Sequence, residues 1–340
     1  MPPGDLIDAA RVARFRGDLA ALTDAPPSPA ARLGIAVSGG SDSLALLLLA
    51  HAAWPDGIAA VTIDHGLRAE AAAEAEAVAA SCATLAIPHA TLHVEGPTPS
   101  SGNLQAWART QRYRLIADWA ARARIGQVAT AHHRDDVAET FLMRAARGAG
   151  VRSLAAMPAI RTLAASPVLL VRPLLGWSRT DLAAIVRDAG LHAVDDPSNA
   201  DPRFDRARVR RLLAVTPDLP PDRLAHTAAN LRDVEEAMEW LVLRVRDRLE
   251  EDADRVRLCA GDLPFELQRR LVARAIETVR QRRGIFAPWR ETEIPSLVRA
   301  LATGGGGTVA DVVGTARGAD WYFRTAPPRR SPESAPTGPK

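Results

Sequence analysis

Between residues 33 and 148 the sequence alternates short apolar runs with longer segments that have the residue spacing of helices. The predicted strands are "LGIAV", "IAAVTID", "HATLHV" and "QVATA", and a predicted helix follows each of them. The strands are almost continuously apolar, as in a sheet that is covered on both faces. This alternation predicts an α/β fold, a parallel sheet with helices on both faces. Ligands of such sheets bind beyond the carboxyl ends of the strands.

The chain of 340 residues is longer than a typical domain of roughly 100–200 residues, so more than one domain is expected. After residue 217 the pattern is almost wholly helical, which predicts a helical C-terminal domain. The predicted parts are an N-terminal helix and linker over 1–27, a catalytic α/β domain over 28–216, a helical accessory domain over 217–302 that binds tRNA, a small β-hairpin region over 303–327, and a disordered tail over 328–340.

The composition, 47% apolar and 24% charged residues, is that of a soluble globular protein. The net charge is only +3, and Lys340 is the one lysine among arginines, so affinity for phosphate has to come from local arginine clusters. Cys82 and Cys259 are far apart and form no CxxC or zinc-binding pattern. No run approaches the ~20 apolar residues of a membrane span. We therefore expect a cytoplasmic protein with no membrane contact.

The loop after the first predicted strand has the sequence "SGGSDS". It lies where a strand ends and a helix begins, so backbone N–H groups and the helix dipole favour an anion there. Its glycines let the backbone approach a phosphate, and its serines offer hydroxyl donors. Asp42 beside phosphates requires a bridging cation. A simple turn with a serine N-cap is the alternative. The candidate nucleotide-binding residues of the loop are Ser38, Gly39, Gly40, Ser41, Asp42 and Ser43.

A second polar string, "TAHHRDDVAET", closes the fourth predicted strand and opens the next helix. Asp136 and Glu139 are three residues apart and therefore share one face of that helix near its N-terminus. A favourable interaction of acidic side chains with the helix dipole is the alternative explanation. We expect His133, and His65 after the second strand, to lie near the nucleotide. Adjacent residues such as His132 and His133 point in different directions, which disfavours a dedicated zinc site.

These strings resemble the signatures of a known enzyme superfamily. "SGGSDS" is similar to the SGGxDS loop of the PP-loop ATP pyrophosphatases, which have the adenine nucleotide alpha hydrolase-like fold and split ATP into AMP and pyrophosphate. Further strings extend the resemblance from Arg32 to Leu213 and make it specific to the tRNA(Ile)-lysidine synthetase family. They are "VTIDHGLR", "ARTQRYRLI", "VRPLLGWSRTDL" and "DDPSNADPRFDRARVR".

Members of that family use ATP to adenylate the wobble cytidine of an isoleucine tRNA with a CAU anticodon. Free L-lysine then attacks C2 of the base, AMP leaves, and the lysidine that forms pairs with A instead of G, so the tRNA reads AUA instead of AUG. The resemblance therefore implies a ligase with ATP and Mg²⁺ as cofactors and with tRNA(Ile) and free lysine as partners. It also suggests a homodimer.

The resemblance implies roles for individual residues. Asp42 would hold Mg²⁺ on the phosphates of ATP, and Arg112 would be a catalytic arginine. Asp136 and Glu139 would bind lysine and take part in the reaction, and Arg206 would be an active-site arginine. Because a lysine amine is protonated at neutral pH, carboxylates suit its recognition, and one of them suits acceptance of its proton. The residues alone do not single out that base.

The basic segment "RFDRARVRRLL" follows the "DPSN" loop, and its position favours contact with tRNA phosphates. A solvated arginine face is the alternative for such a run. Arg206 is followed by Ala207 where the family often has asparagine, so any contact of that asparagine is missing here. The candidate tRNA-binding residues are Arg203, Arg208, Arg210 and Arg211.

Three other functions share part of these sequence features. A PP-loop tRNA thiolase also adenylates a base, but such enzymes need reactive cysteines, and Cys82 lies on an apolar predicted helix. An NAD or GMP synthetase shares the loop but leaves the acidic string unexplained. A non-catalytic, nucleotide-dependent RNA-binding module would not need the full set of Asp42, Arg112, Asp136 and Glu139.

Overall fold

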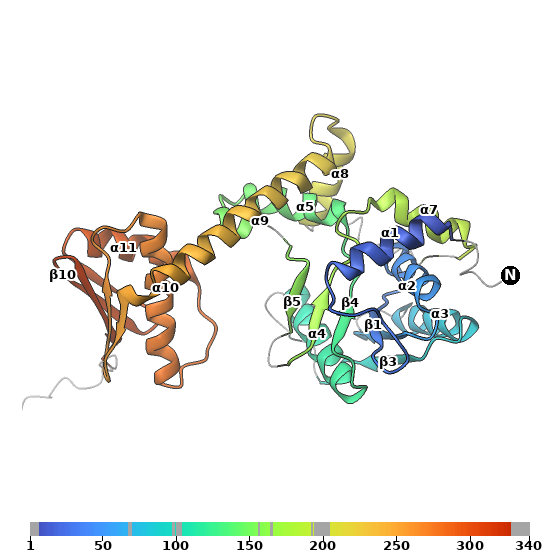
Figure 1. The fold of residues 1–340 in the computed structure, drawn as a ribbon, viewed down its shortest axis with the longest axis horizontal. Helices are drawn as coiled ribbons and strands as arrows, with labels where there is room; N and C mark the ends of the chain where they lie inside the picture. The colour runs from blue at the N-terminus through green and yellow to red at the C-terminus, as the bar shows by residue number, and fades with distance from the viewer. Residues whose placement is uncertain are drawn as a thin grey trace, which may run out of the picture. The chain divides into compact units, whose positions relative to one another are not determined.

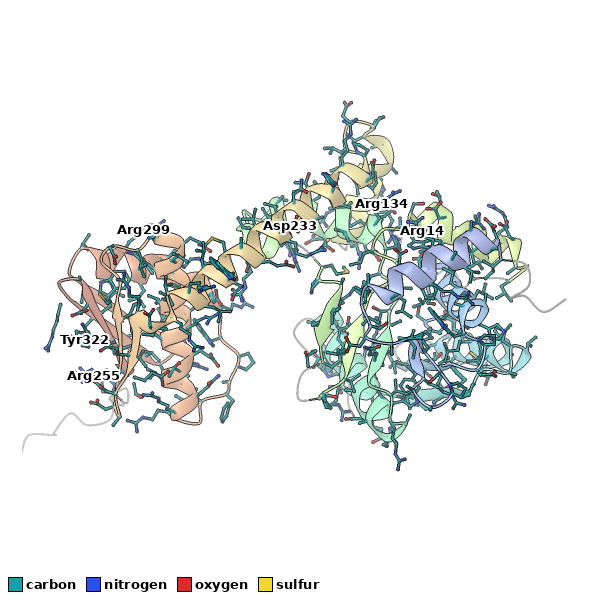
Figure 2. All side chains as sticks on the ribbon, viewed as in Figure 1. Arg14, Arg134, Asp233, Arg255, Arg299 and Tyr322 are labelled. Atoms are coloured by element: carbon teal, nitrogen blue, oxygen red, sulfur yellow. The ribbon has the colours of Figure 1, made fainter. Side chains whose placement is uncertain are left out.

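A computed structural model of the protein describes residues 7–66, 70–96, 99, 104–155, 157–163, 166–191, 193 and 205–327. The chain divides into two compact units, residues 1–232 and 233–340. The division lies inside helix α9 (Pro221–Arg244), where Asp233 is labelled in Figure 2, and not at residue 217 where the sequence predicts it. The predicted disordered tail lies outside the described residues.

The first unit is built on a six-stranded sheet in the order β3-β2-β1-β4-β6-β5. Figure 1 labels four of these strands, β1, β3, β4 and β5. The first five strands in this order are parallel, which confirms the predicted α/β fold, whereas β5 pairs antiparallel with β6. The strands are β1 (Leu33–Ala36), β2 (Ile58–Asp64), β3 (His89–His93), β4 (Gln127–Ala129), β5 (Ile160–Thr162) and β6 (Leu169–Val171). Because the chain passes from β3 back across β1 to β4, β1 and β4 flank a topological switch point, where α/β folds bind ligands.

Helices cover both faces of this sheet. Alternate residues of β2 enter two separate cores: Ile58 and Ala60 pack in the cluster that contains α2, and Ala59 and Val61 pack in the cluster that contains α4. This alternation follows from the two-residue period of a strand. The described helices of the unit are α1 (Ala9–Ala20), α2 (Ser41–Ala53), α3 (Glu70–Thr84), α4 (Leu104–Arg122), α5 (Arg134–Ala145), α6 (Val151–Leu154), α7 (Arg179–Asp188) and α8 (Asp205–Val215).

The second unit is not wholly helical. It contains a five-stranded antiparallel sheet in the order β7-β8-β11-β10-β9, so the C-terminal strands are joined to two strands that the sequence reading missed. Trp321 and Phe323 of β11 pack against α10 and α11 in the buried core. Its elements are η3 (Arg246–Arg248), β7 (Leu249–Glu251), β8 (Val256–Cys259), α10 (Phe265–Arg282), η4 (Glu291–Glu293), α11 (Ile294–Ala302), β9 (Gly306–Val309), β10 (Val312–Arg317) and β11 (Asp320–Thr325).

A buried arginine joins α9 to α10 in the second unit. Arg270 is 4% exposed, and its guanidinium donates hydrogen bonds to Glu235 and Glu239 of α9 and to Glu266 of α10. A buried cation is stable only when carboxylates surround it in this way. Arg270 therefore has a structural role in the second unit.

Candidate active site

The "SGGSDS" loop has the geometry of an anion-binding turn. Gly39 has φ +83°, a backbone conformation that favours glycine, and Gly40 is the extended N-cap residue of α2. Among the described residues no side chain caps α2. The N–H of Ser43 already donates to the carbonyl oxygen of Gly40, whereas those of Ser41 and Asp42 remain available to an anion at the positive end of the helix dipole. The loop follows β1, next to the switch point of the sheet, as the sequence predicts.

Ser43 braces this loop from within. Its buried hydroxyl donates to the carbonyl oxygen of Gly40 at 2.9 Å and accepts from the backbone N–H of Ser38 at 3.1 Å. The hydroxyl oxygen of Ser38 lies 3.3 Å from the hydroxyl oxygen of Ser43. Ser43 thus uses its donor inside the loop, which makes it a residue that shapes the turn, and the predicted donation to a phosphate would require another rotamer.

The "SGGSDS" loop, residues 38–43, is called the phosphate loop below. It contacts the start of α5 through a buried histidine. His133 is 0% exposed and lies with Nε2 3.3 Å from Asp42 and 3.6 Å from Asp136, and with Nδ1 3.5 Å from Asp135. These N···O distances are longer than those of typical hydrogen bonds but are within the range of ion pairs. Burial alone would lower the pKa of His133, but the three carboxylates outweigh it and raise the pKa to about 9. His133 is therefore a cation at neutral pH.

The predicted acidic pair is buried and already holds arginines. Glu139, 1% exposed, accepts hydrogen bonds from Arg206 at 2.7 Å, Arg179 at 2.7 Å and Arg210 at 3.0 Å. Asp136 accepts a second one from Arg206 at 2.7 Å. Burial by itself would raise the pKa of Glu139, but the three guanidinium groups lower it to about 2. Glu139 is thus a permanently ionised centre that draws α5, α7 and α8 together.

The candidate tRNA-binding arginines of α8 differ in what they face. Arg210 turns inward to Glu139, and Arg208 pairs with Asp205, as Arg147 does from the other side. Arg211 is exposed and makes no ion pair with any described residue. Arg203 lies outside the described residues. Arg210 and Arg208 therefore have carboxylate partners in this structure and are not presented as free cations to a polyanion.

The side chains of Arg112 and His65 are in contact at the end of β2. The guanidinium Nε of Arg112, from α4, lies 3.4 Å from Nε2 of His65. Burial, and next the charge of Arg112, lower the pKa of His65, so this imidazole is neutral at pH 7. A neutral imidazole nitrogen accepts from an arginine and leaves the rest of the guanidinium available to an anion.

Two residues of the site had no predicted role. Arg179 donates to Glu139 through its side chain, and its backbone N–H donates to Asp135 at 3.0 Å, so α7 is fastened to α5 twice. Arg179 occurs in the "VRPLLGWSRTDL" string that carries part of the family resemblance. Asp135 occurs in the acidic string, directly before Asp136. Both were visible as motif residues, but no pattern indicated their partners.

The donors present fit a divalent cation shared with phosphates better than a cation held by protein alone. Oδ1 of Asp42 is buried and has no hydrogen-bond partner among the described residues. Within these same parts of the chain no group of three or more His, Cys, Asp and Glu side chains could hold a metal ion. One carboxylate with a free oxygen is the donor set that Mg²⁺ uses when phosphates and water supply its other ligands.

A cavity of about 290 Å³ lies between the phosphate loop and α7. Aliphatic side chains form much of its wall, and such a wall suits the flat face of a nucleotide base. Its lining residues are Ser41, Ala183, Val186, Arg187, Gly190, Leu191 and Ala193.

Comparisons with known proteins agree with this geometry. Residues 12–217 match the PP-loop domain family. The chain is 44% identical over 303 residues to the tRNA(Ile)-lysidine synthase of Zymomonas mobilis, covering 88% of this chain and 90% of that one. It is also 44% identical over 322 residues to the tRNA(Ile)-lysidine synthase of Novosphingobium aromaticivorans, covering 94% of each chain.

Among solved structures, the U34-tRNA thiolase NcsA from Methanococcus maripaludis is similar in fold. The TM-score is 0.55 at 17% sequence identity, and the match covers 67% of this chain and 79% of that one. At this identity the likeness concerns the fold alone.

Proposed function

The chain belongs to the tRNA(Ile)-lysidine synthase family, and we propose that it joins free L-lysine to C2 of the wobble cytidine in tRNA(Ile) with a CAU anticodon. The observation that supports this activity best is the contact between the phosphate loop and the acidic start of α5. Asp42 of the loop lies 3.3 Å from His133, which also contacts Asp136 of the acidic pair. The turn that would bind the nucleotide and the acidic pair that would bind cationic groups are thus adjacent, because both contact His133.

The proposed reaction has two steps. The C2 carbonyl oxygen of the cytidine attacks the α-phosphorus of ATP, and pyrophosphate leaves. The ε-amine of lysine then attacks C2 and gives up a proton, and AMP leaves with the former carbonyl oxygen. Adenylation converts a poor leaving oxygen into a good one, so the protein has to position the reactants and neutralise phosphate charge.

Residues of the site suit these tasks. The open N-terminus of α2 would bind phosphate oxygens, and the free Oδ1 of Asp42 would bind Mg²⁺. When bound, that ion neutralises charge on the phosphates. Arg112 projects from α4 at the end of β2, with part of its guanidinium free for a phosphate. His133, as a buried cation, holds the carboxylates of α5 in place beside the loop.

Lysine recognition by Asp136 and Glu139 needs a rearrangement. Every oxygen of Glu139 already accepts from an arginine, and Arg206 also binds Asp136. A lysine ammonium must therefore share these carboxylates with Arg206 or displace it. With its pKa near 2, Glu139 is a poor proton acceptor, so its part in the proposal is to bind cations and not to act as the general base.

The setting of the reaction is part of the same proposal. Because the proposed substrates are a tRNA and a free amino acid, we infer that the enzyme acts in the cytoplasm. None of the helices in the described stretches is long and apolar enough to cross a membrane. We further infer a homodimer from the family resemblance. The second unit is proposed to bind tRNA outside the anticodon.

A thiolase activity is not favoured. Sulfur transfer needs a reactive thiolate, whereas Cys82 is fully buried and burial raises its pKa to about 11. Cys259 belongs to the second unit and is not paired with it.

Nucleotide products test the proposed use of ATP. With Mg²⁺, lysine, CAU-anticodon tRNA(Ile) and ATP labelled in its α-phosphate, we expect one AMP per lysine incorporated and no formation of AMP without tRNA. Asp42→Asn removes the charge that holds the cation and should lower the rate at least about 100-fold while the circular dichroism spectrum is unchanged. Release of ADP, or near-normal turnover by the variant, would contradict the proposal.

A further inference from the structure

Three arginines beside the active site have no carboxylate partner among the described residues. Arg109 comes from α4, Arg161 from β5, and Arg172 directly follows β6. None of the three forms an ion pair with a residue in the described parts of the chain. This contrasts with Arg206 and Arg210 of α8, which both bind Glu139. We call Arg109, Arg161 and Arg172 the arginine cluster.

The cluster is organised around one aromatic ring. The guanidinium carbon of Arg109 lies 5.0 Å from the ring centroid of Tyr113, and that of Arg161 lies 4.6 Å from it. Arg172 lies near the same tyrosine, whose influence partly opposes the lowering of the pKa of this arginine. Cation–π contacts hold guanidinium groups in place without neutralising them. Tyr113 therefore orders Arg109 and Arg161 beside Arg172 and leaves their charges available.

Arg172 is the buried member of the cluster. It is 2% exposed, its Nη1 donates to the carbonyl oxygen of Pro158, and its Nε has no hydrogen-bond partner among the described residues. A buried cation without a counter-charge is costly, and an anion would relieve that cost. Burial is the main cause that lowers the pKa of Arg172, Tyr113 opposes the shift, and the charges of Arg161 and Arg109 add to the lowering.

The cluster adjoins the active site. Arg172 directly follows β6, which lies next to β4. Arg109 precedes Arg112 by three residues on α4, and Arg112 contacts His65 at the end of β2. His132, in the segment between β4 and α5, has a pKa well below its ordinary value because of burial and then because of Arg172, Arg109, Arg206 and Arg112. One imidazole therefore lies in the combined field of the cluster and of Arg206, the arginine that binds the acidic pair.

We propose that the arginine cluster binds backbone phosphates of the tRNA next to the cytidine that reacts. This inference rests on the proposed function, because it takes tRNA as the polyanion. Arginine binds phosphate through two parallel hydrogen bonds, and such contacts fix the register of a nucleic acid without reading its sequence. The cluster thus positions the anticodon, and the discrimination between isoleucine and methionine tRNA lies elsewhere.

Binding measurements on the full chain test this proposal. Arg109→Gln and Arg161→Gln each remove one exposed or half-exposed charge and leave the buried Arg172 in place. The probes are transcripts of CAU-anticodon tRNA(Ile) and of methionine tRNA, titrated at several salt concentrations without ATP or lysine. Each variant should weaken binding about three- to tenfold, equally for both tRNAs, and should reduce the slope of log K against log salt by about one.

Arg114→Gln is the matched control, because Arg114 is on the same helix but hydrogen-bonds to Gln111 and not to the cluster. It should leave the tRNA affinity and the salt slope unchanged. Unchanged affinity in Arg109→Gln and Arg161→Gln would overturn the proposal. So would weaker ATP binding with normal tRNA binding, because the cluster would then serve the phosphates of the nucleotide.

The two proposals can fail separately. If the wild-type protein incorporates no lysine, but the two variants lose tRNA affinity as described, the proposed ligase reaction is wrong and the phosphate site stands. If lysine is incorporated and the variants bind tRNA normally, only the phosphate site is wrong.

Discussion

At the scale of single residues, two buried groups of opposite charge organise the candidate site, the imidazole of His133 and the carboxylate of Glu139. Asp42, Asp136 and Glu139 were predicted near the carboxyl edge of the sheet from motif position and helix spacing, and the structure brings them to one site around His133 and Arg206. Their chemical roles stay predictions. The arginine partners of Glu139 are 40 to 71 residues away along the chain, and a charge pattern contains no information on such distant pairs.

The buried charge of Glu139 leads to a prediction about acid stability. Its pKa is lowered from 4.5 to about 2, so the folded state holds this proton less tightly than the unfolded state. The stabilisation is therefore present above about pH 4.5 and is lost as the pH falls towards 2. In Glu139→Gln the free energy of unfolding should be lower than in the wild type at pH 7. As the pH falls from 4.5 towards 2, it should also decrease less steeply than in the wild type, with slopes that differ by up to about 1.4 kcal/mol per pH unit.

Chemical denaturation at a series of pH values measures both effects. Glu76→Gln is the control, because Glu76 is exposed on α3 and makes no ion pair with a described residue. It should preserve the wild-type slope. A Glu139→Gln variant with the wild-type stability at pH 7 and the wild-type slope below pH 4.5 would show that the three arginines do not hold Glu139 ionised.

At the scale of secondary-structure elements, the long and strongly patterned segments were predictable and the short ones were not. The first four strands and their helices match the alternation read from the sequence. β5 was missed because its three residues alternate exposed and half-buried positions at a sheet edge. β7 was missed because Leu249–Glu251 continues the charged pattern of the preceding helix, and only pairing with β8 makes it a strand.

The packing of α10 on α9 leads to a prediction at this scale. Arg270→Met should leave Glu235, Glu239 and Glu266 facing each other without the buried cation between them. Breaking a buried ion cluster costs about 3–5 kcal/mol, so the second unit should melt at a clearly lower temperature in calorimetry of the full chain. In Arg255→Met the removed charge is exposed beside Tyr322 (Figure 2), and its loss should change little. Equal melting of both variants would contradict the structural role of Arg270.

At the scale of the whole molecule, the fold and the family follow from the first two thirds of the sequence, and the organisation of the rest does not. The phosphate loop, the acidic string and the strand–helix alternation are local patterns, so they are readable in order along the chain. The sheet of the second unit pairs β8 with β11 although 60 residues separate Cys259 from Asp320 along the chain. Such pairing depends on tertiary packing, and the tRNA-binding role of this unit remains a proposal.

The central claim is that the chain makes lysidine on one particular tRNA, and the modified nucleoside tests it most directly. The full chain is incubated with Mg²⁺, ATP, labelled L-lysine and a CAU-anticodon tRNA(Ile) transcript, and the tRNA is digested and analysed by mass spectrometry. We predict a labelled nucleoside with the mass of cytidine plus lysine minus one water at the wobble position, and none in methionine tRNA with the same anticodon. An unmodified wobble cytidine in tRNA(Ile), or equal labelling of both tRNAs, would contradict the account.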